Sequence, residues 1–194
     1  MTKPPDEAAL REAALMHLAR FAATEAALLR VLRRRVQRWA VQARAEALDA
    51  ETIAEQRGAA LAAAADVVRR LAAAGAVDDA AFAASRAARL SRSGRSRHAI
   101  AVHLAARGVD AETTDKAIAA SRIDEFGAAI LFARRRRAGP FRPSASPPTS
   151  ATTDERQADL AAFARAGFSR AIALRVLALG TDEATDAIER LRRC

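Results

Sequence analysis

Residues 104–118 read LAARGVDAETTDKAI: the end of one helix, a glycine turn and the start of a second helix. Glycine adopts the left-handed backbone that closes a helix, and an aspartate can accept hydrogen bonds from the first free N–H groups of the next helix. The same pattern recurs without gaps when Leu18 and Phe163 are set in register with Leu104. The turn then falls at Ala22, Gly108 and Gly167, the cap at Thr24, Asp110 and Ser169, and an apolar residue at Leu32, Ile118 and Leu177. One helix-turn-helix unit is therefore predicted three times.

The composition favours helices throughout. Of the 194 residues, 55 are Ala and 30 are Arg, both good helix formers, and Tyr is absent. Residues that favour strands are sparse, and so are large side chains that fill a core. We therefore predict an all-α fold of tandem three-helix, helix-turn-helix-like repeats that form an elongated, curved body.

Polar caps and glycines predict about nine helices with short turns between them. Thr52 with Glu55 resembles a capping box that opens the third of these helices. The other predicted caps are Asp6, Thr24, Asp78, Ser96, Asp110, Thr152, Ser169 and Thr181.

The predicted caps, the glycine turns and the prolines divide the chain into four segments. Residues 1–74 are the first predicted repeat, 75–137 the second and 152–194 the third. Between them, residues 138–151 form a predicted linker, because four of the chain's six prolines lie there among serines.

Several classes of protein are excluded or disfavoured. No apolar run approaches the roughly 18 residues of a membrane span, and the first residues lack the pattern of a secretory signal. Cys194 is the single cysteine, and the three histidines lack metal-site spacing. We therefore expect a cytoplasmic protein with no membrane association, no metal and no cofactor. Since no nucleophile has a base at convincing spacing, we also expect a binding protein rather than an enzyme.

The formal net charge of +9 suggests a polyanionic partner, and the basic residues cluster. The guanidinium group makes planar, bidentate contacts to phosphate or carboxylate. A GC-rich genome would explain the preference for Arg over Lys, and solvated helix faces could explain the clusters, so both interpretations stay open. The first cluster is Arg33, Arg34, Arg35 and Arg38; the second is Arg86, Arg89, Arg92, Arg95 and Arg97; the third is Arg134 to Arg137.

The second repeat carries a family resemblance. Residues 67–83, VVRRLAAAGAVDDAAFA, and the basic stretch after them resemble the signature of the bacterial regulatory protein family RecX. Residues 159–177, DLAAFARAGFSRAIALRVL, resemble its third repeat, with the turn at Gly167, Phe168 and Ser169. The signature positions of the second repeat are Gly75, Val77, Asp78, Asp79, Phe82, Ala83, Arg86, Gly94, Ser96, Arg97, Leu104, Gly108 and Val109.

This resemblance implies tandem three-helix repeats and a regulator of the recombinase RecA. Such a protein binds the RecA filament on single-stranded DNA, restrains strand exchange and ATP hydrolysis, and so limits recombination and the SOS response. We expect a monomer that contacts the filament and the single-stranded DNA within it, with weak direct binding to DNA. The candidate contact residues are the first and second arginine clusters.

Two other functions stay open at this point. One is a sequence-specific DNA-binding protein, although the second helix of the middle repeat, AETTDKAIAAS, is nearly neutral and poor in base-reading side chains. The other is a helical adaptor for an acidic protein partner.

Overall fold

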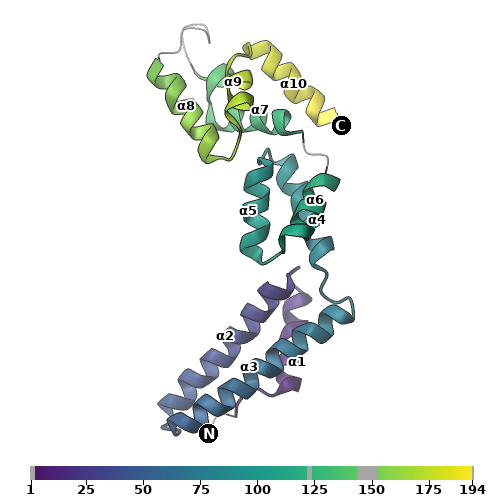
Figure 1. Cartoon of the computed structure of the whole chain (residues 1–194), viewed down its shortest axis with the longest axis vertical. Coiled ribbons are helices and arrows are strands. Elements are labelled where there is room, and N and C mark those ends of the chain that lie inside the picture. Colours follow the sequence, from purple (N-terminus) through teal and green to yellow (C-terminus); the bar gives the residue numbers. More distant parts are fainter. Residues whose placement is uncertain (1–2, 122–123, 144–152, 194) are drawn as a thin grey trace. The chain divides into compact units, whose positions relative to one another are not determined.

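The computed structural model describes residues 3–121, 124–143 and 153–193. These residues form ten α-helices, one 3₁₀ helix and no strand, so the predicted all-α class is confirmed (Figure 1). The predicted elongated, curved shape stays a prediction. The elements are α1 (Glu7–Leu18), α2 (Glu25–Ala45), α3 (Ala50–Ala73), α4 (Asp79–Arg92), α5 (Arg97–Arg107), α6 (Ala111–Ala120), α7 (Glu125–Arg136), η1 (Gly139–Phe141), α8 (Thr153–Arg165), α9 (Arg170–Leu177) and α10 (Thr181–Arg193).

Packing divides the chain into two compact units. The first contains residues 1–82 and 107–109, and the second contains residues 83–106 and 110–194. In the first unit, α2 and α3 lie side by side as the two longest helices and α1 packs against both (Figure 1). Leu10, Leu28, Leu32 and Val36 are fully buried there, and Ala64 lets the helix backbones approach closely. A small number of bulky residues therefore suffices for this core.

The second unit has its main core around α7, α8, α9 and α10. Three aromatic rings meet in it: the centroid of Phe163 lies 5.0 Å from that of Phe132 and 5.7 Å from that of Phe168. Alanines of α7 and the apolar side of α9 complete this core. Helix α7 falls within the predicted second repeat, residues 75–137, but the structure packs it against α9 and α10 of the predicted third repeat.

The residues after α7 are also packed. Pro140 is buried, and the Arg142 guanidinium donates to Glu155 at 2.9 Å and to Asp159 at 2.6 Å. Residues 138–143 of the predicted linker thus belong to the fold of the second unit. The rest of that linker lies among residues 144–152, outside the described part of the chain, as does the predicted cap Thr152.

Most predicted helix caps are present. Asp6, Thr24, Asp78, Ser96, Asp110 and Ser169 each accept a backbone N–H three residues further along the chain. The capping box at Thr52 was wrong: Asp49 caps α3 by accepting the Thr52 N–H at 2.9 Å, so Thr52 lies inside the helix. The prediction of nine helices also missed α7, which Asp124 caps.

Two serine or threonine caps do more than begin a helix. The Ser96 hydroxyl accepts the Ala99 N–H at 3.0 Å and donates to the backbone carbonyl of Ala166 at 2.6 Å. Thr24 likewise accepts the Ala27 N–H and donates to the carbonyl of Arg107 at 2.6 Å. In both cases the accepting carbonyl comes directly before a turn glycine, Gly167 or Gly108. Each buried hydroxyl therefore joins a helix start to a distant helix end.

This double role predicts a stability difference between two serine caps. Ser96→Ala removes a cap and leaves the Ala166 carbonyl without its donor, so we expect a loss of about 2–4 kcal/mol in the free energy of unfolding. Ser169→Ala is the matched control, since this exposed hydroxyl only accepts the Ile172 N–H at 3.3 Å, and about 1 kcal/mol is expected. Urea denaturation followed by circular dichroism measures both values. Equal losses would contradict the joining role of Ser96.

The aspartate caps predict a pH dependence of stability. Backbone N–H donors, chiefly those of Ala9, Thr52 and Thr113, hold the pKa of Asp6, Asp49 and Asp110 below the usual 3.8. The unfolded chain therefore takes up protons first as the pH falls, so the contribution of these charged caps is fully present above about pH 4 and is lost progressively as the pH falls through their lowered pKa.

Asn substitution tests this directly, because its side-chain oxygen accepts the same bond without titrating. In thermal melts between about pH 6 and pH 3, the melting temperature of the triple Asp→Asn variant should fall less steeply than that of the natural chain. Parallel curves would show that other groups set the acid sensitivity.

Candidate nucleic-acid interface

An exposed basic face runs along α2. The buried residues Leu28, Leu32 and Val36 occupy one side of this helix, and Arg34 and Arg38 lie one turn apart on the opposite side. At about 100° per residue, five exposed arginines fall within about 140° of the helix circumference. We call this set the α2 basic face: Arg30, Arg33, Arg34, Arg38 and Arg44.

The α2 basic face lacks compensating acids. Glu25, in the first turn, is the single carboxylate of the helix and lies on the other side. Val41, 58% exposed, sits among the arginines. Arg30 is anchored at one end, where its guanidinium donates to the Arg107 carbonyl at 3.2 Å. From Arg30 to Arg44 the face offers exposed positive charge over about 21 Å, given a rise of about 1.5 Å per residue.

Arg35 does not share this face. It lines a shallow hollow with Trp39 and the residues that precede α1, including Lys3 and Pro4. Of the four arginines in the first predicted cluster, Arg33, Arg34 and Arg38 are thus brought together, and Arg35 is set apart.

The second predicted cluster is more dispersed. Arg86 is half-buried on α4, and Arg89 and Arg92 are exposed on the same helix. Since three residues turn a helix by about 300°, Arg86 and Arg92 point about 120° apart rather than to one side. Arg97 faces a carboxylate, with its Nε 3.8 Å from Glu125, which also accepts the Arg97 backbone N–H at 3.0 Å. Arg95 is exposed and lies near Arg135.

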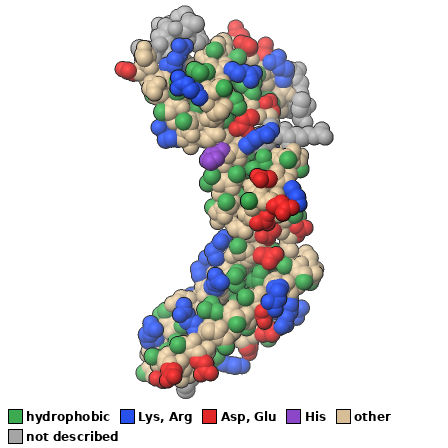
Figure 2. Space-filling model, viewed as in Figure 1, with side chains coloured by type: hydrophobic (Ala, Val, Ile, Leu, Met, Phe, Trp, Pro, Cys, Tyr) green, Lys and Arg blue, Asp and Glu red, His purple; other side chains and the backbone are tan. Residues whose placement is uncertain are grey.

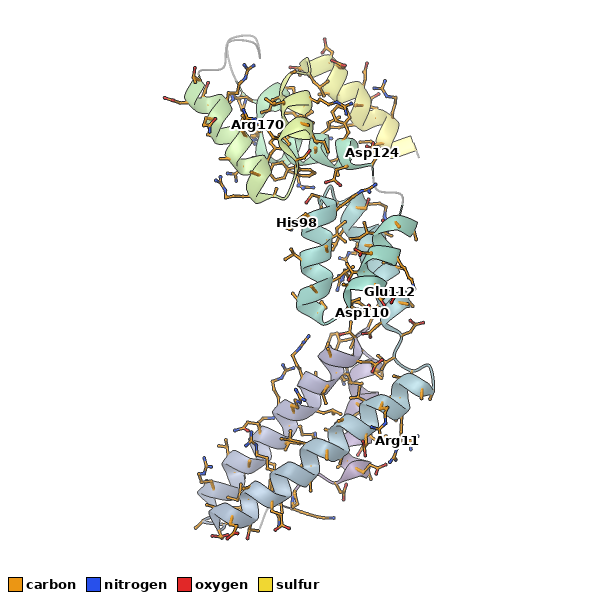
Figure 3. The ribbon with its side chains drawn as sticks, in the orientation of Figure 1. Arg11, His98, Asp110, Glu112, Asp124 and Arg170 are labelled. Atoms are coloured by element: carbon orange, nitrogen blue, oxygen red, sulfur yellow. The ribbon has the colours of Figure 1, made fainter. Side chains whose placement is uncertain are left out.

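An acidic helix lies in the same unit. Asp110 and Glu112, labelled at the start of α6 in Figure 3, are exposed together with Asp115. Lys116, the single basic residue of α6, pairs with Glu112 at 2.6 Å. Figure 2 shows acidic side chains gathered over this part of the chain and basic ones spread over the α1–α3 part. Because its carboxylates would repel phosphate, α6 is poorly suited to contact DNA.

The described residues offer neither a metal site nor a membrane-spanning helix. They contain no group of three or more His, Cys, Asp or Glu residues that could hold a metal ion. No helix among them is long and apolar enough to cross a bilayer.

The predicted arginine clusters omit two members of the α2 basic face, Arg30 and Arg44. Arg30 is four residues before Arg34, and Arg44 is six after Arg38, so helical periodicity applied to the whole helix would have found both. The sequence contains no comparable signal for the proximity of Arg95 to Arg135, because that proximity depends on tertiary packing.

Comparisons with known proteins agree with the helical fold. Residues 78–118 match the family model described as RecX, second three-helix domain, and this range covers α4, α5 and all but the last two residues of α6. A regulatory protein RecX from Myxococcus xanthus is 41% identical over 170 residues, which cover 87% of this chain and 83% of the relative. Another, from Agrobacterium fabrum, is 36% identical over 115 residues, 58% of each chain. This chain therefore belongs to the RecX family of regulatory proteins.

Proposed function

We propose that the chain binds the nucleoprotein filament of the recombinase RecA and restrains its ATPase and strand-exchange activities. Membership of the RecX family supports the regulatory part of this proposal. The α2 basic face is the observation that supports a nucleoprotein partner, because five exposed arginines face solvent with no carboxylate among them.

The dimensions of the α2 basic face suit a phosphate backbone. A face about 21 Å long can contact several successive phosphates of one nucleic-acid strand. Contacts to phosphates carry no sequence information directly, which fits a regulator that must act on filaments of any sequence. Attraction between the basic chain and the filament would also speed their encounter.

The α2 basic face and the second cluster have different roles in this proposal. Arg33, Arg34 and Arg38 contact phosphates, because they share one exposed face. Arg89 and Arg92, which fan over α4 in the second unit, contact acidic groups of RecA subunits or phosphates between them. The chain acts as a monomer that limits recombination and the SOS response, and it catalyses no reaction of its own.

Paired substitutions in α2 test this assignment through the RecA ATPase. With RecA on single-stranded DNA, the natural chain should lower the rate of ATP hydrolysis. The variant Arg34→Gln with Arg38→Gln should need about tenfold more protein for the same effect, since two phosphate contacts are lost. Arg11→Gln with Arg57→Gln is the matched control, because it removes two exposed charges from α1 and α3, and a change below about threefold is expected.

An unchanged rate of hydrolysis at several-fold excess of the natural chain would overturn the proposed function. Equal losses in the two paired variants would show that total charge matters and the α2 basic face does not.

A further inference from the structure

A pocket of about 420 Å³ opens on the surface of the second unit. Three segments line it: the loop at residues 93–96, the last turns of α7, and the turn after α8 at Ala166 and Phe168. Arg95, Arg135 and Arg136 contribute three guanidinium groups, and Phe132 contributes an aromatic ring. No Asp or Glu is among the described residues that line it. The pocket combines Arg95 of the second predicted cluster with Arg135 and Arg136 of the third, so no single predicted cluster accounts for it.

The walls of the pocket are fixed by contacts between the three segments. The Arg135 guanidinium donates to the carbonyls of Ser93 and, at 3.0 Å, of Gly94. Gly94 has a φ of +70°, and a Cβ there would lie 2.7 Å from the Leu131 Cβ, so the loop fits against α7 only with glycine. The Ser96 hydroxyl holds the Ala166 carbonyl at 2.6 Å. The pocket is therefore formed before any ligand arrives, which lowers the entropic cost of binding.

The charges of the pocket repel one another in the free protein. Arg135 has a pKa below its ordinary value, first because of its burial and second because of the positive charge of Arg95. Arg135 already donates to two carbonyls, so it serves as a fixed charge, whereas Arg95 and Arg136 are exposed and able to reach a ligand. A bound anion would relieve the repulsion, and three converging guanidinium groups suit phosphate.

The apolar side of the pocket narrows the choice of ligand. Phe132 is partly buried, and its ring packs on Phe168 with centroids 5.5 Å apart, which holds the phenyl plane in place. The volume lies in the range of small-molecule sites, about 300–1,000 Å³, and exceeds the need of a phosphate group alone. A nucleotide combines an anion with a flat, apolar base that can stack on an aromatic side chain.

We propose that this pocket binds one nucleotide of single-stranded DNA, with its phosphate held by Arg95 and Arg136 and its base against Phe132. A duplex keeps its bases stacked inside, so an unpaired strand is the source that fits. This inference rests on the proposed function for its biological context, because the RecA filament holds single-stranded DNA. It adds a direct contact between the second unit and one base.

Binding of short probes without RecA tests the pocket. The probes are a fluorescein-labelled thymidine pentanucleotide, the abasic oligomer with the same phosphates, and a pentaglutamate peptide. Arg95→Gln with Arg136→Gln should weaken binding of the pentanucleotide about tenfold. The matched control, Arg156→Gln with Arg190→Gln, removes two exposed charges of the same unit outside the pocket and should change binding less than about threefold. The natural chain should bind the abasic oligomer about five- to hundredfold more weakly than the pentanucleotide.

Other results would overturn the site, the base contact or the assignment of the ligand. Equal binding by the pocket variant and its control overturns the site. Equal affinity of the natural chain for the abasic oligomer and the pentanucleotide overturns the base contact. Pentaglutamate binding as tight as that of the pentanucleotide, and lost in the pocket variant, would assign the pocket to acidic peptides instead. Urea denaturation checks that both variants fold.

The RecA ATPase assay separates this inference from the proposed function. If the pocket fails these tests while the natural chain still restrains ATP hydrolysis, the proposed function stands without the pocket. If the pentanucleotide binds as expected while ATP hydrolysis is unchanged, the pocket stands without the proposed function.

Discussion

The buried hydroxyl of Ser96 satisfies two backbone groups at once, because it accepts the Ala99 N–H that begins α5 and donates to the Ala166 carbonyl that ends α8. Few large side chains are available to hold helices together in this alanine-rich chain, so polar contacts at helix ends carry more of the specificity. A buried carbonyl without a donor costs about 1–3 kcal/mol, which makes any other approach of these segments unfavourable. The basic pocket depends on this approach, because Ser96 and Ala166 both line it.

The same construction occurs in the first unit. Thr24 caps α2 and donates to the Arg107 carbonyl, and the Glu25 N–H donates to Asp79 at 2.9 Å, as the Arg97 N–H does to Glu125. The glycine after each accepting carbonyl meets the start of the capped helix, Gly108 at Ala26 and Gly167 at His98. Eighteen residues separate Asp6 from Thr24 and also Asp78 from Ser96. These contacts pair Thr24 with Ser96, whereas the ungapped sequence register had paired Thr24 with Asp110.

Local signals predicted what local interactions determine. Caps such as Asp110 and Ser169 were found because each bonds to an N–H three residues away. Helix α7 was missed because its sequence, EFGAAILFARRR, includes glycine and aromatic residues that favour helices weakly. Packing explains the glycine. A Cβ on Gly127 would lie 2.7 Å from the Leu191 side chain, so glycine at this position allows α10 to approach α7 closely. Likewise, Arg135 and Gly94 are 41 residues apart, and no sequence period brings them together.

The arrangement of charge argues against codon preference as the whole explanation of the arginine clusters. Arg34 and Arg38 lie about 6 Å apart along α2, within the Debye length of about 8 Å at physiological salt, so they repel each other. Like charges at this spacing destabilise a helix by a few tenths of a kcal/mol. A core built from alanine buries little apolar area per residue and leaves a small margin for such losses. Codon preference selects arginine over lysine, but it does not place five arginines on one face of α2 and three around one pocket. A polyanionic ligand that relieves the repulsion accounts for both arrangements.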